Sequence, residues 1–261
     1  MDRLTVNMRV VAALGARSVK QTFRRPQLVA PILVFPTLLL AIQTGGAGGA
    51  VNLPGFPPVD NFLSFMLAGA MMQSSLLAGN TGGIALAVDL EMGFTDRLLA
   101  APISRFAIVA GRLAGVAVLG VVTAVWFIAI GLIFGASFEQ GVPGMVVMIV
   151  LTSLASVAFG GLSAAIALYT GQASVVQGLF PLIFVILFLS SAFFPANLLL
   201  EPAKTISDYN PLSLIVDGVR DPVISSLTAK TVAEALGAIA LVGAISTALS
   251  ALALRRRLRA G

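Results

Sequence analysis

The residue types that usually carry chemistry are scarce in this chain, and two of them are missing. The sequence contains no cysteine and no histidine, which excludes thiol nucleophiles, imidazole bases, disulfide frameworks and the usual Cys/His zinc sites. The three lysines follow Val19, Ala203 and Ala229, so none completes the phosphate loop Gly-x-x-x-x-Gly-Lys-[Ser/Thr]. We therefore predict that this chain has no catalytic residue, no metal site and no bound cofactor of its own.

Polar side chains inside apolar segments are the remaining candidates, because burying them against lipid is costly. We single out Gln73, Asn80 and Gln177 as candidates for lining a transport path. The alternative is hydrogen bonding between helices, which stabilises a helix pair by only about 0.6 kcal/mol on average. The two interpretations are balanced for Gln73 and Asn80, whereas helix packing is favoured for serines such as Ser190 and Ser191.

The elements that must position these residues are membrane helices. The chain has 261 residues, of which 58% are hydrophobic and only 10% charged, whereas soluble domains carry about 25% charged residues. A membrane-spanning helix needs about 20 apolar residues. We predict an all-α polytopic fold of one transmembrane domain, with an interfacial segment 1–27, spans within 28–254 and a cytoplasmic tail 255–261. The six predicted spans are 28–44, 61–88, 106–135, 142–169, 173–194 and 232–254.

Small residues and prolines add local expectations to these spans. Prolines 31 and 36 lie in the first span, where neighbouring groups must satisfy the carbonyls that they leave without a donor. Pro181 predicts a bend in the fifth span, and a tight turn is expected at 169–172. Glycine pairs with a spacing of four residues predict close helix packing; they are Gly79/Gly83, Gly111/Gly115 and Gly131/Gly135.

The distribution of cations predicts the orientation. Most of the 16 Lys and Arg residues fall in the N-terminal segment, between the second and third spans, and in the C-terminal tail. Because such cations favour the cytoplasmic side, both termini are predicted to be cytoplasmic, which requires an even number of spans. We expect a multi-pass protein of the plasma membrane. The cations lie in blocks beside apolar runs, which favours contact with membrane lipids over binding of nucleic acid.

The N-terminal segment 4–25 is predicted to be an amphipathic helix rather than a span. At 100° per residue its cations form one narrow stripe, and its apolar residues lie on the other side. This pattern is typical of a helix at the membrane interface, with cations toward anionic headgroups. The alternative is a solvated helix that only enforces topology. The stripe contains Arg9, Arg17, Lys20 and Arg24, opposite Leu4, Met8, Val11, Leu14 and Val19.

A cytoplasmic segment from Asp89 to Arg105 joins the second and third spans. Leu90, Phe94 and Leu98 recur every four residues and would form one apolar ridge on a short helix, with Asp89 pointing away. Such a helix is suited to docking in the groove of a partner. The alternative is a passive connector lying on the membrane surface.

The external segment 195–230 is too apolar for a free loop. We predict short helices that dip partway into the membrane before the last span, which requires surrounding protein. Asn210, Pro211 and Arg220 mark this segment. The alternative is a packed external cap without a role in transport.

Two of these motifs resemble sequence patterns of a known family and occur in the same order. Glu91, Gly93, Leu98 and Pro102 resemble the Glu-x-Gly-x-x-x-x-Leu-x-x-x-Pro pattern of permease subunits in the type-2 ABC exporter family, the group that contains daunorubicin-type drug exporters. The Asn210-Pro211-Leu212 run, with Arg220 downstream, is similar to that family's signature before the last span. The resemblance covers nearly the whole chain, in matching order.

The resemblance implies a permease subunit of an ATP-driven exporter, working with a separate ABC ATPase chain that binds ATP and Mg²⁺. Two permease copies, or one copy and a homologue, would enclose a path for an amphipathic drug-like or lipid-like substrate, as in multidrug efflux and antibiotic resistance. The cytoplasmic segment would be the coupling helix that docks on the ATPase. Its candidate residues are Leu90, Glu91, Gly93, Phe94, Arg97, Leu98 and Pro102.

An ion-coupled secondary transporter is the main alternative function. Such proteins commonly carry ionisable residues at membrane depth. Here the charges lie at span ends or in loops, and Arg112 and Glu234 are close enough to an interface to reach it with their side chains. We also find no clear inverted repeat of the kind that many secondary transporters contain.

Overall fold

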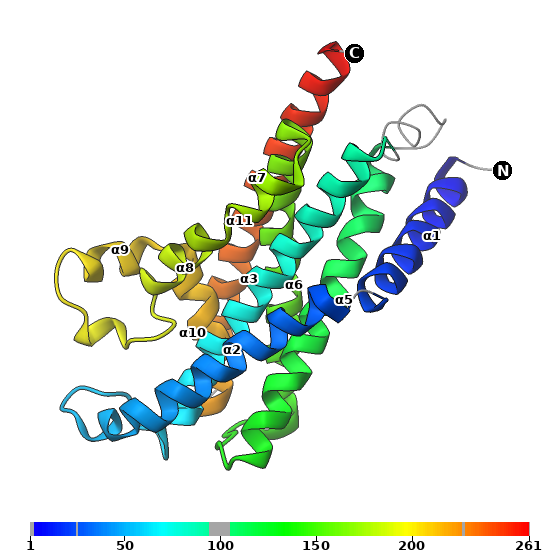
Figure 1. Cartoon of the computed structure of the whole chain (residues 1–261). Coiled ribbons are helices and arrows are strands. Elements are labelled where there is room, and N and C mark those ends of the chain that lie inside the picture. The colour runs from blue at the N-terminus through cyan, green and yellow to red at the C-terminus, as the bar shows by residue number, and fades with distance from the viewer. Residues whose placement is uncertain (1–2, 25, 94–104, 226–227, 261) are drawn as a thin grey trace.

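The computed structural model describes residues 3–24, 26–93, 105–225 and 228–260, and within these ranges it contains helices and no strands. The long helices stand side by side in one bundle, as Figure 1 shows. The all-helical prediction is therefore confirmed. Within the described ranges five helices are long and apolar enough to cross a membrane.

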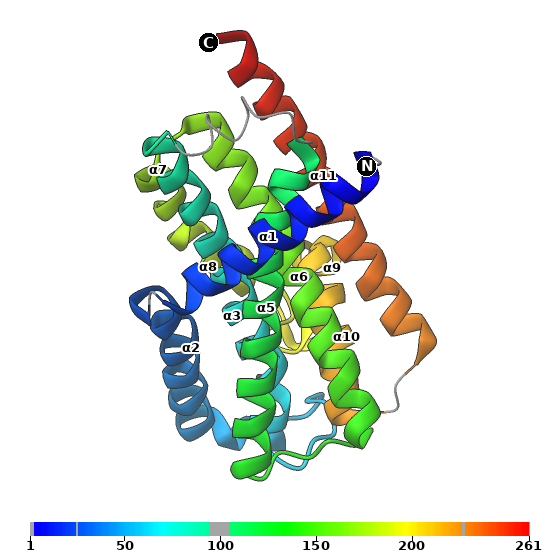
Figure 2. The same ribbon diagram turned by 90° about the vertical axis from the view of Figure 1, so that its right-hand side faces the viewer.

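The first helix, α1 (Arg3–Phe23), crosses α5 (Arg105–Ile133) obliquely, as Figure 2 shows. Two glycines of α5 allow the close approach. A Cβ atom at Gly111 would lie 2.6 Å from the Cβ of Leu14, and one at Gly115 would lie 2.3 Å from Ser18 Oγ. The predicted helix and the predicted packing role of this glycine pair are confirmed. Its position at the membrane interface stays a prediction.

The second helix, α2 (Pro26–Ala47), continues into a short 3₁₀ turn, η1 (Gly48–Asn52). Pro36 has no N–H to donate to the carbonyl of Ile32, four residues earlier. The hydroxyl of Ser74 on α3 donates to that carbonyl instead. The proline is therefore tolerated for the reason that the sequence suggested, because a neighbouring helix supplies the missing donor.

The third helix, α3 (Phe62–Glu91), is the centre of the bundle, and its apolar stretch is completely buried. Its closest neighbour is α6 (Gly141–Thr170). A Cβ atom at Gly79 would lie 2.7 Å from the backbone nitrogen of Gly160, and one at Gly83 would lie 2.5 Å from the Cβ of Ser163. The packing predicted for Gly79 and Gly83 is confirmed.

The pair Gly131/Gly135 behaves differently, and half of that prediction is wrong. A Cβ atom at Gly131 would lie 2.8 Å from Leu67 Cδ1 on α3, so this glycine does permit close packing. Gly135 has a φ of +79° and nothing within 4 Å of its Cβ position. It serves the turn after α5, because glycine adopts positive φ without steric cost.

The predicted fifth span is two short helices, α7 (Ala173–Gln177) and α8 (Phe180–Phe188). The tight turn before α7 is confirmed, since Gly171 ends α6 in the left-handed conformation with a φ of +66°. The interruption between α7 and α8 falls just before Pro181, where a bend was predicted. This apolar unit is shorter than the five long candidates, so the count of six spans stays a prediction.

Short helices follow α8, as predicted for the segment before the last span. They are η2 (Ala196–Leu198), α9 (Ala203–Tyr209) and α10 (Pro211–Ile224). The last helix is α11 (Ala229–Ala260), which packs against α6 and α10. The depth of these short helices in a membrane is not fixed by their fold and stays a prediction.

Candidate functional site

A cluster of charged side chains, the Asp89 cluster, joins three helices at the end of the bundle where α3 finishes. Asp89 lies in the last turn of α3 and is 1% exposed. Its Oδ2 atom forms an ion pair with Arg112 of α5 and lies 3.9 Å from Arg17 Nη2 of α1. Ser18 of α1 also donates to the carbonyl of Arg112. The C-terminal part of α1 is therefore tied to both helices that flank the segment 94–104.

Reasoning from the sequence missed this cluster. Arg112 was expected to extend to the membrane interface, and Asp89 was expected only to point away from an apolar ridge. A signal was present in the sequence, because an acid and a base stand close to the two ends of one short connection between predicted spans. Opposite charges placed in this way favour pairing when burial would otherwise leave each unpaired.

The prediction of an apolar docking ridge is wrong for its first residue, Leu90. Leu90 is 4% exposed and packs in a small core with Ala167, Leu168 and Val176. The helix α3 ends at Glu91, and Gly93 has a φ of +66°, which breaks the helical phase after Leu90. Leu90 therefore stabilises the chain itself and is not part of a surface offered to a partner.

Glu91 is exposed, and its Oε1 atom accepts a hydrogen bond from the backbone nitrogen of Ala173 (2.8 Å). It therefore caps the start of α7, where a carboxylate is favoured by the unpaired N–H groups of the first turn. This contact connects the beginning of the predicted coupling segment to the broken apolar unit α7–α8. The other predicted coupling residues lie outside the described residues; they are Phe94, Arg97, Leu98 and Pro102.

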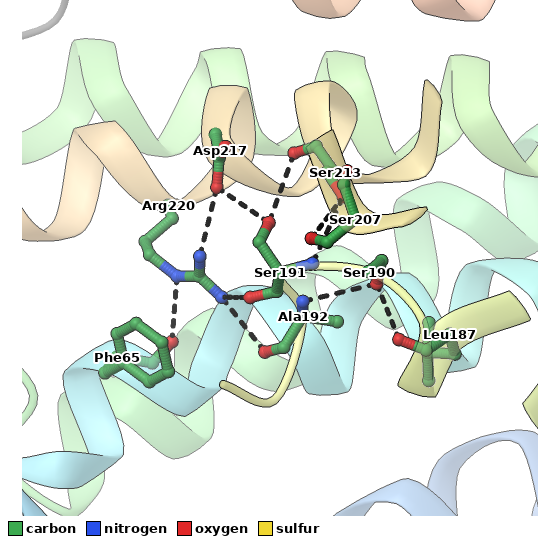
Figure 3. Close-up of polar contacts among 9 residues, drawn as sticks. All are labelled: Phe65, Leu187, Ser190, Ser191, Ala192, Ser207, Ser213, Asp217 and Arg220. Carbon is green, nitrogen blue, oxygen red and sulfur yellow. Dashed lines mark hydrogen bonds and ion pairs between the residues drawn. The ribbon is translucent and has the colours of Figure 1, made fainter. Parts of the chain in front are cut away.

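A second cluster surrounds Arg220 of α10, which is 5% exposed (Figure 3). Its Nη2 atom donates to the carbonyl oxygens of Ser191 (2.7 Å) and Ala192 (2.9 Å), and its Nε atom donates to that of Phe65 (3.3 Å). Its Nη1 atom donates to Asp217 Oδ1 (3.1 Å), and its guanidinium lies 4.1 Å from the centroid of the Phe65 ring. One side chain thus holds together α3, α10 and the turn after α8.

Asn210, which precedes Arg220 in the chain, also joins two helices. Its Oδ1 atom accepts from the backbone nitrogen of Leu212 and caps α10. Its Nδ2 atom donates to the carbonyl oxygens of Ile186 and Leu189, at the end of α8. Pro211 occupies the first turn of α10, where a missing N–H costs nothing. Asn210, Pro211 and Arg220, singled out by the sequence, therefore stabilise one junction between α8 and α10.

The serines predicted to favour helix packing are part of the same junction. Ser191 donates from its hydroxyl to Asp217 Oδ1 (2.9 Å), and its backbone nitrogen donates to Ser213 Oγ. Ser190 donates to the carbonyl of Leu187, and Ser213 donates to that of Ser207. Figure 3 shows these groups facing one another between α10 and the turn after α8. Their hydrogen bonds favour the packing interpretation over a transport path.

The three residues proposed for a transport path lie in different environments. Asn80 is 4% exposed, and its Oδ1 atom accepts from Ser163 Oγ of α6, which favours helix packing. Gln73 is fully buried within the chain, and neither of its amide atoms has a hydrogen-bond partner among the described residues. Only Gln177, on α7, is exposed. The structure does not bring these three side chains together.

The contacts in both clusters join helices to one another. Among the described residues no group of three or more acidic side chains could hold a metal ion. The Asp89 cluster joins separate helices through charged side chains, and the Arg220 cluster joins helix ends through backbone carbonyls. Both clusters hold neighbouring helices in fixed positions relative to one another.

Comparison with known proteins gives one family and two relatives. A family model described as "ABC-2 type transporter" matches residues 9–224. Two curated relatives, from Porphyra purpurea and Pyropia yezoensis, each bear the name "Putative transport permease ycf38" and are 26% identical to this chain over 213 residues. Each alignment covers 80% of this chain and 72% of the relative. The family match begins within α1 and ends with α10, so it includes both clusters.

Proposed function

The chain belongs to the ABC-2 type transporter family, and we propose that it is the membrane-spanning subunit of an ATP-driven exporter. The observation that carries this proposal is the family match, which runs through every described helix before α11. A multi-span helical membrane permease is what the family and the fold have in common. We further propose a separate ATPase chain, an amphipathic substrate and an orientation in the membrane.

The ATPase is proposed to be a separate chain. A transporter of this kind must bind ATP, and none of the three lysines can complete a phosphate loop. The partner would contact the segment that follows Glu91, in which Phe94, Arg97, Leu98 and Pro102 lie. The Asp89 cluster supports this assignment, because it ties α1, α3 and α5 together at the base of that segment. A displacement of this segment would be transmitted to α1, α3 and α5 together.

Two copies of the chain, or one copy and a homologue, are proposed to enclose the path. Large apolar side chains around η2 and α9 are strongly exposed on the single chain, including Leu200 (84%) and Tyr209 (85%). An apolar surface of this kind favours cover by lipid or by another chain. An amphipathic drug-like or lipid-like substrate suits a path with few polar groups, and multidrug efflux is one such activity. Gln177 is the exposed polar candidate for that path.

The proposed orientation places the Asp89 cluster and the ends of α1 and α11 at the cytoplasmic face of the plasma membrane. Figure 1 shows the start of α1, the end of α3 and the end of α11 at the same end of the bundle. Arg112, Arg255 and Arg256 lie there too, as expected for the side that favours cations. Five long spans and the broken unit α7–α8 would together give an even number of crossings.

The test of the ATPase proposal is hydrolysis by purified protein. The chain alone should neither bind nor hydrolyse ATP, and in complex with a separate ABC ATPase subunit it should stimulate hydrolysis by that subunit. A matched control is the ATPase with its phosphate-loop lysine replaced, which should abolish activity of the pair. Robust hydrolysis by the chain alone, free of contaminating ATPase, would end the permease proposal.

The test of the orientation uses the natural absence of cysteine. Glu139 lies between α5 and α6 and Ser174 lies in α7, both exposed and at opposite ends of the bundle. In intact cells an impermeant thiol reagent should label Glu139→Cys and leave Ser174→Cys unlabelled until the membrane is opened. The reverse pattern would overturn the orientation and leave the fold untouched.

A further inference from the structure

A groove of about 380 Å³ runs between α6 and α11 at the end of the bundle that carries the C-terminal end of α11. Its floor is apolar, formed by side chains such as Ile166 of α6 and Leu249 and Leu252 of α11. Leu249 is 45% exposed and Leu252 is 61% exposed. The groove therefore faces outward from the bundle and is mostly apolar over the last turns of α6 and the adjacent part of α11.

A cation and an aromatic ring close the end of this groove. The guanidinium carbon of Arg256 lies 4.6 Å from the centroid of the Tyr169 ring, and Arg256 Nη1 donates to the Tyr169 hydroxyl. The ring stacks against the guanidinium at the end of the groove, and no other hydrogen bond of the guanidinium is made to the residues that the structure describes. Among the described residues no acidic side chain forms an ion pair with Arg256.

The depth of these groups in the membrane follows from the spans. The candidate span of α11 ends at Arg256, and that of α6 ends at Thr170, one residue after Tyr169. The groove is thus apolar within the last turns of two spans and cationic where those spans end. This is the order of groups in a phospholipid, with acyl chains followed by a phosphate at the interface.

We propose that this groove binds one anionic phospholipid of the cytoplasmic leaflet. The phosphate would accept two N–H donors from the planar guanidinium of Arg256, a geometry for which arginine is suited and lysine is not. The acyl chains would lie over Leu249 and Leu252. The proposal uses the orientation given above, but its binding measurement needs neither ATPase nor substrate.

The test is lipid binding by the full chain in detergent, measured by native mass spectrometry with phosphatidylglycerol and with phosphatidylcholine. Wild-type protein should retain phosphatidylglycerol in preference. Arg256→Ala should weaken that binding about fivefold, the loss expected when one cation near a membrane surface is removed. Arg256→Lys should recover only part of it, because the charge remains and the stacked fork is lost.

Arg255→Ala is the matched control, because it removes the same charge from the next position of α11 without touching the groove. It should bind phosphatidylglycerol within about twofold of wild type, since an effect of general charge alone would weaken both variants equally. Equal losses in the two variants would overturn the site. If inorganic phosphate displaces bound phosphatidylglycerol as well as free phosphatidylglycerol does, the groove is a simple anion site and the lipid proposal is wrong.

Discussion

The Asp89 cluster and the Arg220 cluster each bury a charged side chain, Asp89 in one and Arg220 in the other, but they bind their arginines in different ways. Arg220 donates to three backbone carbonyls and one carboxylate, and its ring contact is with Phe65 on a neighbouring helix. Arg112 instead pairs with Asp89, a side chain that approaches from another helix. One Oδ atom of Asp89 is buried without a hydrogen-bond partner among the described residues.

The difference lies in what must move for each cluster to come apart. Backbone carbonyls at a chain turn have fixed directions, so if the Arg220 side chain rotates away it leaves three buried acceptors without a donor at once. A pair of side chains from separate helices can break and re-form by rotation about χ angles, at the cost of exposing the charges. We infer that the Arg220 cluster fixes the fold at one end and that the Asp89 cluster permits rearrangement at the other.

The largest expected effect is that of removing the Arg220 guanidinium. Arg220→Met would take a donor from three carbonyls, each about 1–3 kcal/mol when buried without a replacement, in a protein of marginal stability. We expect loss of folded protein in fluorescence-detected size-exclusion chromatography. Arg220→Lys should rescue little, because an ammonium group cannot reach the carbonyls in the same planar arrangement. A monodisperse Arg220→Met protein with wild-type melting would show that the junction does not fix the fold.

The Asp89 cluster should respond through paired substitutions. Arg112→Gln should lower the free energy of unfolding by up to about 3–5 kcal/mol, because Asp89 is buried and would keep only Arg17, 3.9 Å away, as a partner. Asp89→Asn should lower it by less, because the Arg112 side chain is partly exposed. The double variant should lose less than the sum of the two. A double-mutant cycle from thermal melting measures this coupling. If the two losses are simply additive, the ion pair does not hold α3 to α5.

Asn210 allows the two contacts of one side chain to be separated. Asn210→Asp keeps the oxygen that caps α10 and loses the two N–H donors to the end of α8. Asn210→Ala loses both, and we expect it to cost about 1–2 kcal/mol, with Asn210→Asp in between. Thermal melting of both variants beside wild type provides the measurement. If Asn210→Asp melts at the same temperature as wild type, the contact with the end of α8 does not contribute to stability.

Glu91 should have the smallest effect on stability, because its contact with Ala173 is exposed. Glu91→Gln retains an oxygen acceptor and should cost less than about 0.5 kcal/mol, whereas Glu91→Ala should cost about 1 kcal/mol. If the segment couples to an ATPase, Glu91→Ala should also reduce substrate-stimulated hydrolysis at equal expression. Unchanged pull-down and hydrolysis would leave Glu91 with its capping role alone.

The sequence predicted the helices well because composition and length decide them in a membrane. The tight turn at Gly171 and the interruption before Pro181 were also predictable, since both depend on local backbone preferences. Leu90 was misplaced because a four-residue spacing does not show that α3 continues through Glu91 and stops at Gly93. Tertiary contacts decided its environment, and a single sequence does not contain them.

The candidate sites were less predictable for a related reason. Arg220 and Asn210 could be singled out because they are similar to the family's signature before the last span. Their partners could not be inferred, since the acceptors are backbone carbonyls of a distant turn. Arg112 was expected at the membrane interface, and Asp89 was expected to point away from an apolar ridge. Both positions were misjudged because span ends are uncertain by several residues, and one turn of helix separates an interface from a buried position.

The contact between α3 and α6 has a consequence for motion. At Gly79 and Gly160 the two backbones touch with no side chain between them. A side chain can absorb a small displacement by changing its rotamer, whereas touching backbones must separate or stay fixed. We therefore expect α3 and α6 to move as one rigid unit. The hinges of a transport cycle would lie outside this unit, in α2 with its two internal prolines and in the interrupted α7–α8.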